Sequence, residues 1–215
     1  MKEFITYSPA MLKTFEQCKK KFEYKYIKGL SIPVDTTKMK QGKNLHAIAN
    51  YYLKNFNIDK FEKVLSEQEM ILWNNLKNTK YFNFETINSE YNLTGKVENY
   101  WISGRLDALV KDKDENYYIL DYKTGQIPKN PEYDYQTIIY LLIADKFIKN
   151  YNTLSFVYID LKNNQTHEII FTPQKKEEYE KKLVTILKDI EKCTKLNIFN
   201  KCKNTCICEF NKLCN

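Results

Sequence analysis

Arginine is nearly absent from this sequence: Arg105 is the only one, although lysine and arginine together number 34. An arginine side chain can read a guanine edge through two parallel hydrogen bonds, and lysine does not replace it in that role. The scarcity of arginine therefore argues against sequence-specific recognition of DNA. Any contact with a nucleic acid is expected at phosphates and base faces, without strong sequence specificity.

Long apolar runs are also missing. The longest, Ile138–Ala144, is far shorter than the roughly 20 residues that a membrane-spanning helix needs. No apolar stretch of the signal-peptide type follows Met1, and no internal repeat or low-complexity linker is present. We therefore expect a cytoplasmic protein that does not enter a membrane.

The chain is long enough to bury one substantial core, because it has 215 residues of which 43% are hydrophobic. We expect a single domain, 1–215, with a helical N-terminal part at about 8–78, a strand-rich core at about 81–171, and a C-terminal helix and tail at about 173–215. The net charge of +7 and the pI of about 8.9 favour a polyanionic partner.

Hydrophobic periodicity predicts an α/β fold with a mixed central β-sheet flanked by helices. Helix start and stop signals support this, such as Ser8-Pro9 at the start of the first helix and Thr172-Pro173 at the start of the last. His167 falls in a predicted strand and is assigned no role. The expected helices are 8–29, 41–54, 59–77, 133–149 and 173–196, and the expected strands are 81–93, 100–110, 117–124, 153–161 and 165–171.

The segment Val97–Gln126 is the most informative stretch of the sequence. Two apolar and aromatic runs flank the polar cluster Lys111–Asn116, which predicts an antiparallel hairpin closed by a five-residue turn centred on Asp114. In that register Asp107 lies opposite Asp121, and Arg105 lies opposite Lys123, on one face of the sheet. Two carboxylates and a lysine are thereby brought into one patch.

Two interpretations of this patch are open. Like charges in directly opposed positions destabilise a sheet, and Lys123 alone can compensate for them in a structural ion-pair cluster. Alternatively, Asp107 and Asp121 are oxygen ligands of the kind that Mg²⁺ and Mn²⁺ prefer. A lysine beside such a metal site can stabilise an attacking hydroxide or the charge on a phosphate.

The hairpin sequence resembles a known family. Residues 104–107 read GRLD and residues 121–125 read DYKTG. Together they are similar to the G-x-x-D … D-x-K-T-G core of the PD-(D/E)XK nuclease superfamily, in its RecB-like exonuclease branch. The resemblance implies a restriction-endonuclease-like core, in which Asp107, Asp121 and the backbone carbonyl of Tyr122 hold the metal and Lys123 is catalytic.

Three further elements extend the resemblance. The GKNLH segment that ends at His46 matches a G-x-x-x-H element that supplies a metal-ligating imidazole, although a lone helical histidine is normally a core or boundary residue. Gln136 and Tyr140, at i and i+4 of a predicted helix, resemble the Q-x-x-x-Y motif that positions substrate. Without this resemblance, Gln136 and Tyr140 would be interpreted as polar residues at the boundary of the core. Glu90 falls where RecB-like proteins often carry a glutamate on the strand before the hairpin. An exposed strand glutamate without such a role is an equally good interpretation.

The cysteines resemble those of RecB-like nucleases that carry an iron–sulfur cluster, including the CRISPR-associated and AddB-type nucleases. The first helix around Cys18 matches their opening segment, with Lys19 in place of a frequent proline. Their tail pattern, C-x-x-C-x5-C, fits Cys208 and Cys214, but its first position falls on Thr205. Either Cys206 or Cys202 would then complete the set. The resemblance favours a [4Fe–4S] cluster joining the N- and C-terminal segments, although four cysteines also suit Zn²⁺.

The resemblance therefore implies a Mg²⁺- or Mn²⁺-dependent DNA exonuclease or processing nuclease that acts on single-stranded DNA or DNA ends. Recombination, repair or CRISPR adaptation is the implied setting, with protein partners of those complexes. Two alternatives belong to other classes. One is a non-catalytic DNA-binding adaptor that retains the fold and an iron–sulfur or zinc site, and the other is a zinc-stabilised RNA-binding protein.

Overall fold

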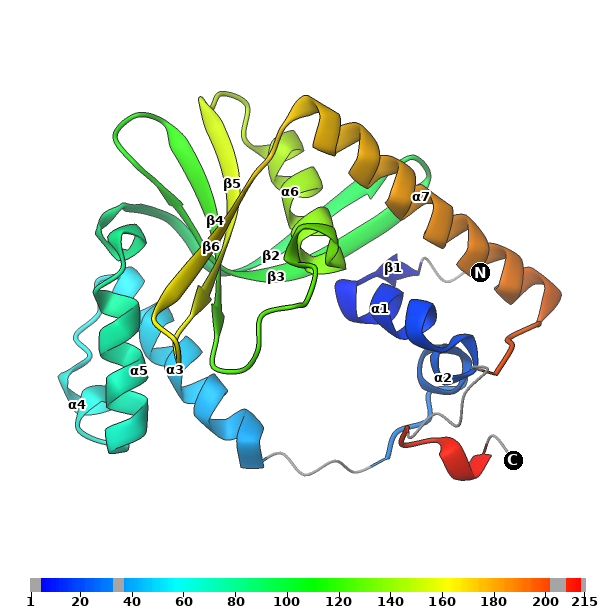
Figure 1. The fold of residues 1–215 in the computed structure, drawn as a ribbon, viewed down its shortest axis with the longest axis horizontal. Coiled ribbons are helices and arrows are strands. Elements are labelled where there is room, and N and C mark those ends of the chain that lie inside the picture. The colour runs from blue at the N-terminus through cyan, green and yellow to red at the C-terminus, as the bar shows by residue number, and fades with distance from the viewer. Residues whose placement is uncertain (1–4, 33–36, 202–207, 214–215) are drawn as a thin grey trace.

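The computed structural model describes residues 5–32, 37–201 and 208–213, and a six-stranded sheet lies at its centre (Figure 1). The strands are β1 Thr6–Tyr7, β2 Glu85–Val97, β3 Tyr100–Lys111, β4 Asn116–Lys123, β5 Thr153–Asp160 and β6 Gln165–Ile170. The α-helices are α1 Pro9–Gln17, α2 Lys19–Phe22, α3 Thr37–Leu53, α4 Asp59–Glu62, α5 Glu67–Lys77, α6 Tyr135–Phe147 and α7 Pro173–Leu196. A π-helical turn at Glu23–Ile27 follows α2 directly. Turns of 3₁₀ helix occur at Lys80–Asn83, Pro131–Tyr133 and Asn211–Leu213.

Strand β3 is the organising strand, because it pairs with three others. It runs antiparallel to β2 over its whole length, antiparallel to β4 over its last residues, and parallel to β1 near its start. Strand β4 then pairs parallel with β5, and β5 pairs antiparallel with β6. The sheet is therefore mixed and is flanked by helices, as the sequence predicts.

Each face of the sheet has its own hydrophobic core. On one face α1, α6 and α7 pack against the strands, and on the other face α3 and α5 do so. The alternation along β5 shows why: Phe156 and Tyr158 join the first core, whereas Val157 and Ile159 join the second. None of the helices among the described residues is both long and apolar enough to cross a membrane.

Helix α6 is buried on nearly all sides, from Thr137 through Ala144. Asp134 caps its first turn by accepting the backbone N–H of Gln136, at 2.9 Å. Its polar side chains near the N-terminus are therefore placed by a helix that the core holds rigidly. The predicted helix 133–149 is shorter in the structure because Pro131–Tyr133 forms a separate 3₁₀ turn.

Two predicted helices are interrupted. The first breaks at Cys18, whose extended backbone (φ −161°) ends α1 and begins α2, and whose thiol accepts the N–H of Lys21 at 3.4 Å. The third breaks because Ser66 and Glu69 form a capping box that starts α5 afresh. The second helix starts at Thr37, four residues earlier than predicted, and ends at Leu53. Helix α7 has the predicted bounds.

Gly104 in β3 is required by the close approach of α6. A Cβ atom at this position would lie 2.1 Å from Cε1 of Tyr140, well inside the contact distance of two carbons. By contrast, a Cβ at Gly42 in α3 would make an ordinary contact, 3.5 Å from the Thr124 hydroxyl. The glycine of the GRLD segment thus lets the Tyr140 ring lie directly on the strand.

We expect Gly104→Ala to destabilise the fold by about 1–3 kcal/mol, because the added methyl overpacks the β3–α6 contact. Gly42→Ala is the matched control and should be neutral or stabilising by up to about 1 kcal/mol, since alanine favours the helix. Urea unfolding followed by circular dichroism measures both. Equal stability of Gly104→Ala and the parent chain would contradict this packing role.

Candidate active site

The candidate site lies where β3 and β4 part. Their ladder runs from the Lys111–Tyr117 pair to the Ala108–Leu120 pair and goes no further. The next residue, Asp107, accepts the backbone N–H of Tyr122 on its own Oδ2, at 2.9 Å. A carboxylate side chain therefore takes the place of the next ladder contact. The hairpin register and the 112–116 turn are those predicted, but Asp107 and Asp121 do not form a ladder pair, and neither do Arg105 and Lys123.

The regular alternation of β3 is interrupted at the same point. Leu106 and Leu109 are three residues apart, yet both pack in the core beside α6. Strict alternation would place them on opposite faces. Asp107 and Ala108 lie between them on the side of α3, so Asp107 does not simply share a face with Asp121. The prediction that Asp107 and Asp121 share one face is wrong for this reason. Both side chains nevertheless reach the point where β3 and β4 diverge, between Asp107 and Asp121, which we call the fork.

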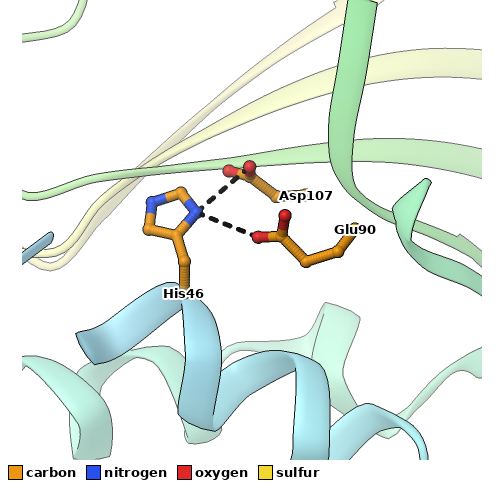
Figure 2. Close-up of side chains that lie close together, drawn as sticks. All are labelled: His46, Glu90 and Asp107. Carbon is orange, nitrogen blue, oxygen red and sulfur yellow. Dashed lines mark ion pairs between the residues drawn. The ribbon is translucent and has the colours of Figure 1, made fainter. Parts of the chain in front are cut away.

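His46, Glu90 and Asp107 form a cluster that joins α3, β2 and β3 (Figure 2). The Nδ1 atom of His46 lies 3.1 Å from Asp107 Oδ1 and 3.6 Å from Glu90 Oε1. All three residues are partly exposed, and one ligand atom from each lies within 4.8 Å of the others. Glu90 has a positive φ of 48°, an uncommon conformation for glutamate in a strand. The three elements therefore meet at a point where the backbone of Glu90 is strained.

Asp121 is held from the face of the sheet that α6 covers, opposite the face that carries His46. Its side chain is only 4% exposed, lies 2.7 Å from Nζ of Lys123, and accepts a short hydrogen bond from Nε2 of Gln136. Lys123 also donates to Oε1 of Gln136, at 3.3 Å. The buried Oδ2 of Asp121 is the atom that faces the Lys123 ammonium. A cation bound at the fork would share this carboxylate with the lysine.

Tyr140 fixes the start of the fork. Its hydroxyl donates to the backbone carbonyl of Arg105 at 2.8 Å, within the stretch of β3 that β4 does not pair. Tyr122 packs its ring against His46, with centroids 5.5 Å apart, and its buried hydroxyl has no hydrogen bond among the described residues. Two side chains, from Tyr140 and Asp107, therefore satisfy backbone groups that the diverging strands expose.

The charges at the fork perturb one another. Burial, reinforced by the charge of Asp107, raises the pKa of Asp121 to about 6, and Lys123 and Gln136 oppose this shift only in part. Burial lowers the pKa of His46, but its hydrogen bond to Asp107 and the charges of Asp107, Asp121 and Glu90 outweigh burial and raise it. A divalent cation bound here would favour the charged carboxylates and lower the pKa of Asp121.

The donor set fits a divalent metal ion. Carboxylate oxygens from Asp107 and Glu90 and one imidazole nitrogen from His46 lie within 4.8 Å of one another, and oxygen-rich sets of this kind suit Mg²⁺ or Mn²⁺ better than softer metals. The carboxylate of Asp121 lies outside this group of three and is paired with Lys123, 2.7 Å away. Sequence reasoning singled out His46, Asp107, Asp121, Lys123, Gln136 and Tyr140, and the structure brings all of them to this fork.

Two residues were missed or left open by the sequence. Glu90 was undecided, and the structure places it between His46 and Arg105, whose Nε lies 2.9 Å from Glu90 Oε2. Arg105 was expected opposite Lys123, but the β3–β4 ladder ends at the Ala108–Leu120 pair, and on its other side Arg105 pairs with Asn92 of β2. The signal that identified Asp107, the GRLD segment, includes Arg105 and gave it no separate role.

The predicted cysteine site falls only in part on described residues. Cys18 is buried and Cys208 is partly buried, whereas Cys202, Cys206 and Cys214 lie outside the described residues. Cys193 is buried in the core beside α6, near Lys19 and Asp189. Burial raises the pKa of the Cys193 thiol, with Lys19 opposing the shift.

The segment 208–213 packs against the turns that follow Cys18. Lys21 of α2 forms an ion pair with Glu209 at 2.9 Å, and the Tyr24 hydroxyl donates to the carbonyl of Leu213 at 2.7 Å. The rings of Tyr24 and Phe210 lie 5.6 Å apart. Residues near the two ends of the chain are thus in direct contact (Figure 1).

Comparisons with known proteins concern the family and the fold. A family model described as the PD-(D/E)XK nuclease superfamily matches residues 58–215. The crystal structure of a "Putative exonuclease" from Eubacterium rectale has a TM-score of 0.62 at 11% identity, covering 97% of this chain and 87% of that one. The crystal structure of SSO0001 has a TM-score of 0.42 at 17% identity, covering 94% and 80%. A search of curated proteins finds no match. At these identities the structural likeness concerns the fold alone.

We expect Asp121→Asn to be more stable than the parent chain at pH 7 in the absence of metal. Because the folded-state pKa of Asp121 is raised from 3.8 to about 6, folding must keep a buried carboxylate charged above pH 6. Between pH 6 and pH 4 the parent chain takes up this proton in the folded state first, so the difference should shrink. Urea unfolding in a chelator at pH 4, 5, 6 and 7 measures it. A difference that grows as pH falls would contradict the raised pKa.

Proposed function

This chain belongs to the PD-(D/E)XK nuclease superfamily, and on that premise we propose that it is a metal-dependent nuclease that hydrolyses phosphodiester bonds in DNA. The observation that carries the proposal is the fork, where Asp107 and His46 from one layer meet Asp121 and Lys123 from the other. A structural ion pair between Asp121 and Lys123 would not require the neighbouring His46, Glu90 and Asp107, whose ligand atoms lie within 4.8 Å of one another. The exonuclease type is part of the same proposal.

His46, Asp107, Asp121 and the backbone carbonyl of Tyr122 would hold one or two Mg²⁺ or Mn²⁺ ions, and we add Glu90 to this set on its position. Such an ion supplies an activated water and neutralises charge on the phosphate. Lys123, 2.7 Å from Asp121, is placed to orient the attacking water and to stabilise developing negative charge. Gln136 holds Lys123 and Asp121 in register, and Tyr140 fixes the strand that carries Asp107.

The substrate would be DNA bound through its backbone and without strong sequence preference, because only one arginine is available for reading base edges. From the sequence, the lysines of the predicted first helix are candidates to line its path: Lys13, Lys19, Lys20, Lys21 and Lys25. Lys13, Lys19, Lys20 and Lys21 form ion pairs with Asp134, Asp189, Glu23 and Glu209. These pairs reduce the positive field of that helix. Recombination, repair or CRISPR adaptation remains the proposed setting, with partners from those complexes.

A [4Fe–4S] cluster held by Cys18, Cys208, Cys214 and either Cys206 or Cys202 belongs to the same proposal. Two features support it: the buried thiol of Cys18 stands at a helix break, and residues 208–213 pack against the turns that follow it. A metal bound from both ends would add to these contacts and stabilise the fold. Zn²⁺ is the alternative occupant.

We expect Asp107→Ala, Asp121→Ala and Lys123→Ala each to abolish DNA hydrolysis while the fold and DNA binding persist. Each change removes a ligand or the charge-stabilising group, and mutations of this kind cost at least about 10²-fold in rate. Gel assays of labelled DNA with Mn²⁺, and circular dichroism of each variant, measure the two effects.

Lys113→Ala, in the turn at the far end of the hairpin, is the matched control and should retain full activity. If the triple variant Asp107→Ala, Asp121→Ala, Lys123→Ala still degrades DNA with added Mn²⁺, the site assignment is wrong. An inactive parent chain that binds DNA would favour a non-catalytic module.

Anaerobically purified protein should be brown and contain about four irons per chain. Cys18→Ala should lose this metal and destabilise the protein about as much as Cys208→Ala or Cys214→Ala, because the ligands come from both ends. Iron analysis and thermal unfolding measure this. Of Cys202→Ala and Cys206→Ala, the one that bleaches the protein identifies the remaining ligand.

Cys193→Ala is the control for this set, because the thiol packs in the hydrophobic core. Its removal should lower the stability of the fold only by the amount expected for a small core truncation. A colourless protein holding one zinc would transfer the site to zinc and leave the nuclease proposal intact. Full metal content in Cys18→Ala would refute the link between the two ends.

A further inference from the structure

The hairpin of β2 and β3 has one buried and one exposed face beyond the fork. On the buried face Leu93, Val97 and Ile102 pack beside α6. The opposite face is largely exposed and polar. We call this surface the β2–β3 track, and it consists of Asn92, Thr94 and Lys96 on β2 and Trp101, Ser103 and Arg105 on β3.

The track is continuous with the candidate active site. Its residues pair across the strands as Lys96 with Trp101, Thr94 with Ser103 and Asn92 with Arg105. One step further along the two strands come Glu90 and Asp107. Arg105 and Asp107 are two residues apart in the same strand, so their Cα atoms are separated by about 6.6 Å.

Arg105 connects the track to the ligand cluster directly. Its Nε lies 2.9 Å from Glu90 Oε2, and Glu90 Oε1 lies 3.6 Å from the imidazole of His46. The arginine side chain is nevertheless 66% exposed. The ion pair therefore orients the guanidinium beside the site and leaves its outer N–H groups directed to solvent, where a phosphate could accept them bidentately.

The composition of the track fits a single-stranded nucleic acid. Trp101 is 39% exposed, which is unusual for so large an aromatic ring, and Nζ of Lys96 lies 5.6 Å from its ring centroid. An exposed ring flanked by a cation suits a base stacked on the ring with its phosphate beside the cation. None of the six track residues is acidic, so no carboxylate opposes a phosphate before Glu90.

We propose that the β2–β3 track binds one strand of the substrate and leads it to the metal site, with a base stacked on Trp101 and a phosphate held by Arg105. This inference rests on the proposed nuclease function and names the form of DNA that the site takes. A duplex keeps its bases stacked inside and offers no free base face to Trp101, so the track selects a single strand.

The two tryptophans of the chain make the proposal directly testable. Trp73 is fully buried and donates its indole N–H to Glu62, whereas Trp101 is exposed on the track. Titration of unlabelled oligothymidine into the protein, in a chelator that prevents hydrolysis, should quench tryptophan fluorescence. Trp101→Phe should lose this quenching and retain the Trp73 signal, and duplex DNA of equal length should not quench the parent chain.

Affinity for a labelled single strand, measured by fluorescence anisotropy without divalent metal, provides the second readout. Trp101→Ala should weaken binding about 5- to 150-fold, and Trp101→Phe should weaken it less because a ring remains. Arg105→Gln should lower the slope of log affinity against log salt by about 0.7, while Arg105→Lys should keep it. Lys113→Gln is the matched control for a lost surface charge and should leave the slope unchanged.

The proposal is overturned if Trp101→Phe is quenched as strongly as the parent chain, or if Trp101→Ala and Arg105→Gln bind single strands with parental affinity and salt slope. Equal quenching by duplex DNA would also overturn it. These outcomes can be distinguished from failure of the nuclease proposal. A protein that cleaves DNA without the quenching and affinity changes refutes the track alone. A chain that shows the quenching but never cleaves DNA refutes the nuclease function and keeps the track.

Discussion

The candidate site depends on one backbone event, the parting of β3 from β4 at Asp107. A sheet normally satisfies its N–H and C=O groups through neighbouring strands, and exposing them inside a protein is costly. Here Asp107 accepts the N–H of Tyr122, and the Tyr140 hydroxyl donates to the carbonyl of Arg105. The side chains that would act on a substrate are thus also those that stabilise the opened sheet. This dual role fixes their positions more firmly than loop residues would be fixed.

The fork also explains how groups from two layers meet. An intact sheet separates the helices on its two faces, so a histidine from α3 and a glutamine from α6 would not serve one site. Where the strands part, His46 reaches Asp107 from one side and Gln136 reaches Asp121 from the other. The cost is electrostatic, because burial, reinforced by the charge of Asp107, raises the pKa of Asp121 to about 6. Lys123 offsets part of that cost, and a bound cation would offset more.

Much of the fold was predictable from sequence because its signals are local. The β3–β4 register followed from the polar turn at 112–116, and the α7 bounds followed from Thr172-Pro173. The break at Cys18 was not predictable from periodicity, because apolar residues continue at helical spacing through it. The capping box at Ser66 and Glu69 was present in the sequence and could have located the start of α5. At the site, motif residues were found, but their contacts were not.

Those contacts depend on features that no residue spacing encodes. Glu90 meets His46 because its backbone adopts a positive φ and because β3 shifts its alternation between Leu106 and Leu109. The same shift leaves Arg105 and Trp101 on an exposed face while Gly104 and Leu106 turn toward α6. A single irregularity in β3 therefore has two consequences: it turns Asp107 toward α3, and it sets the exposed polar face in line with the carboxylates. The surface beside the site and the site itself thus follow from the same backbone constraint.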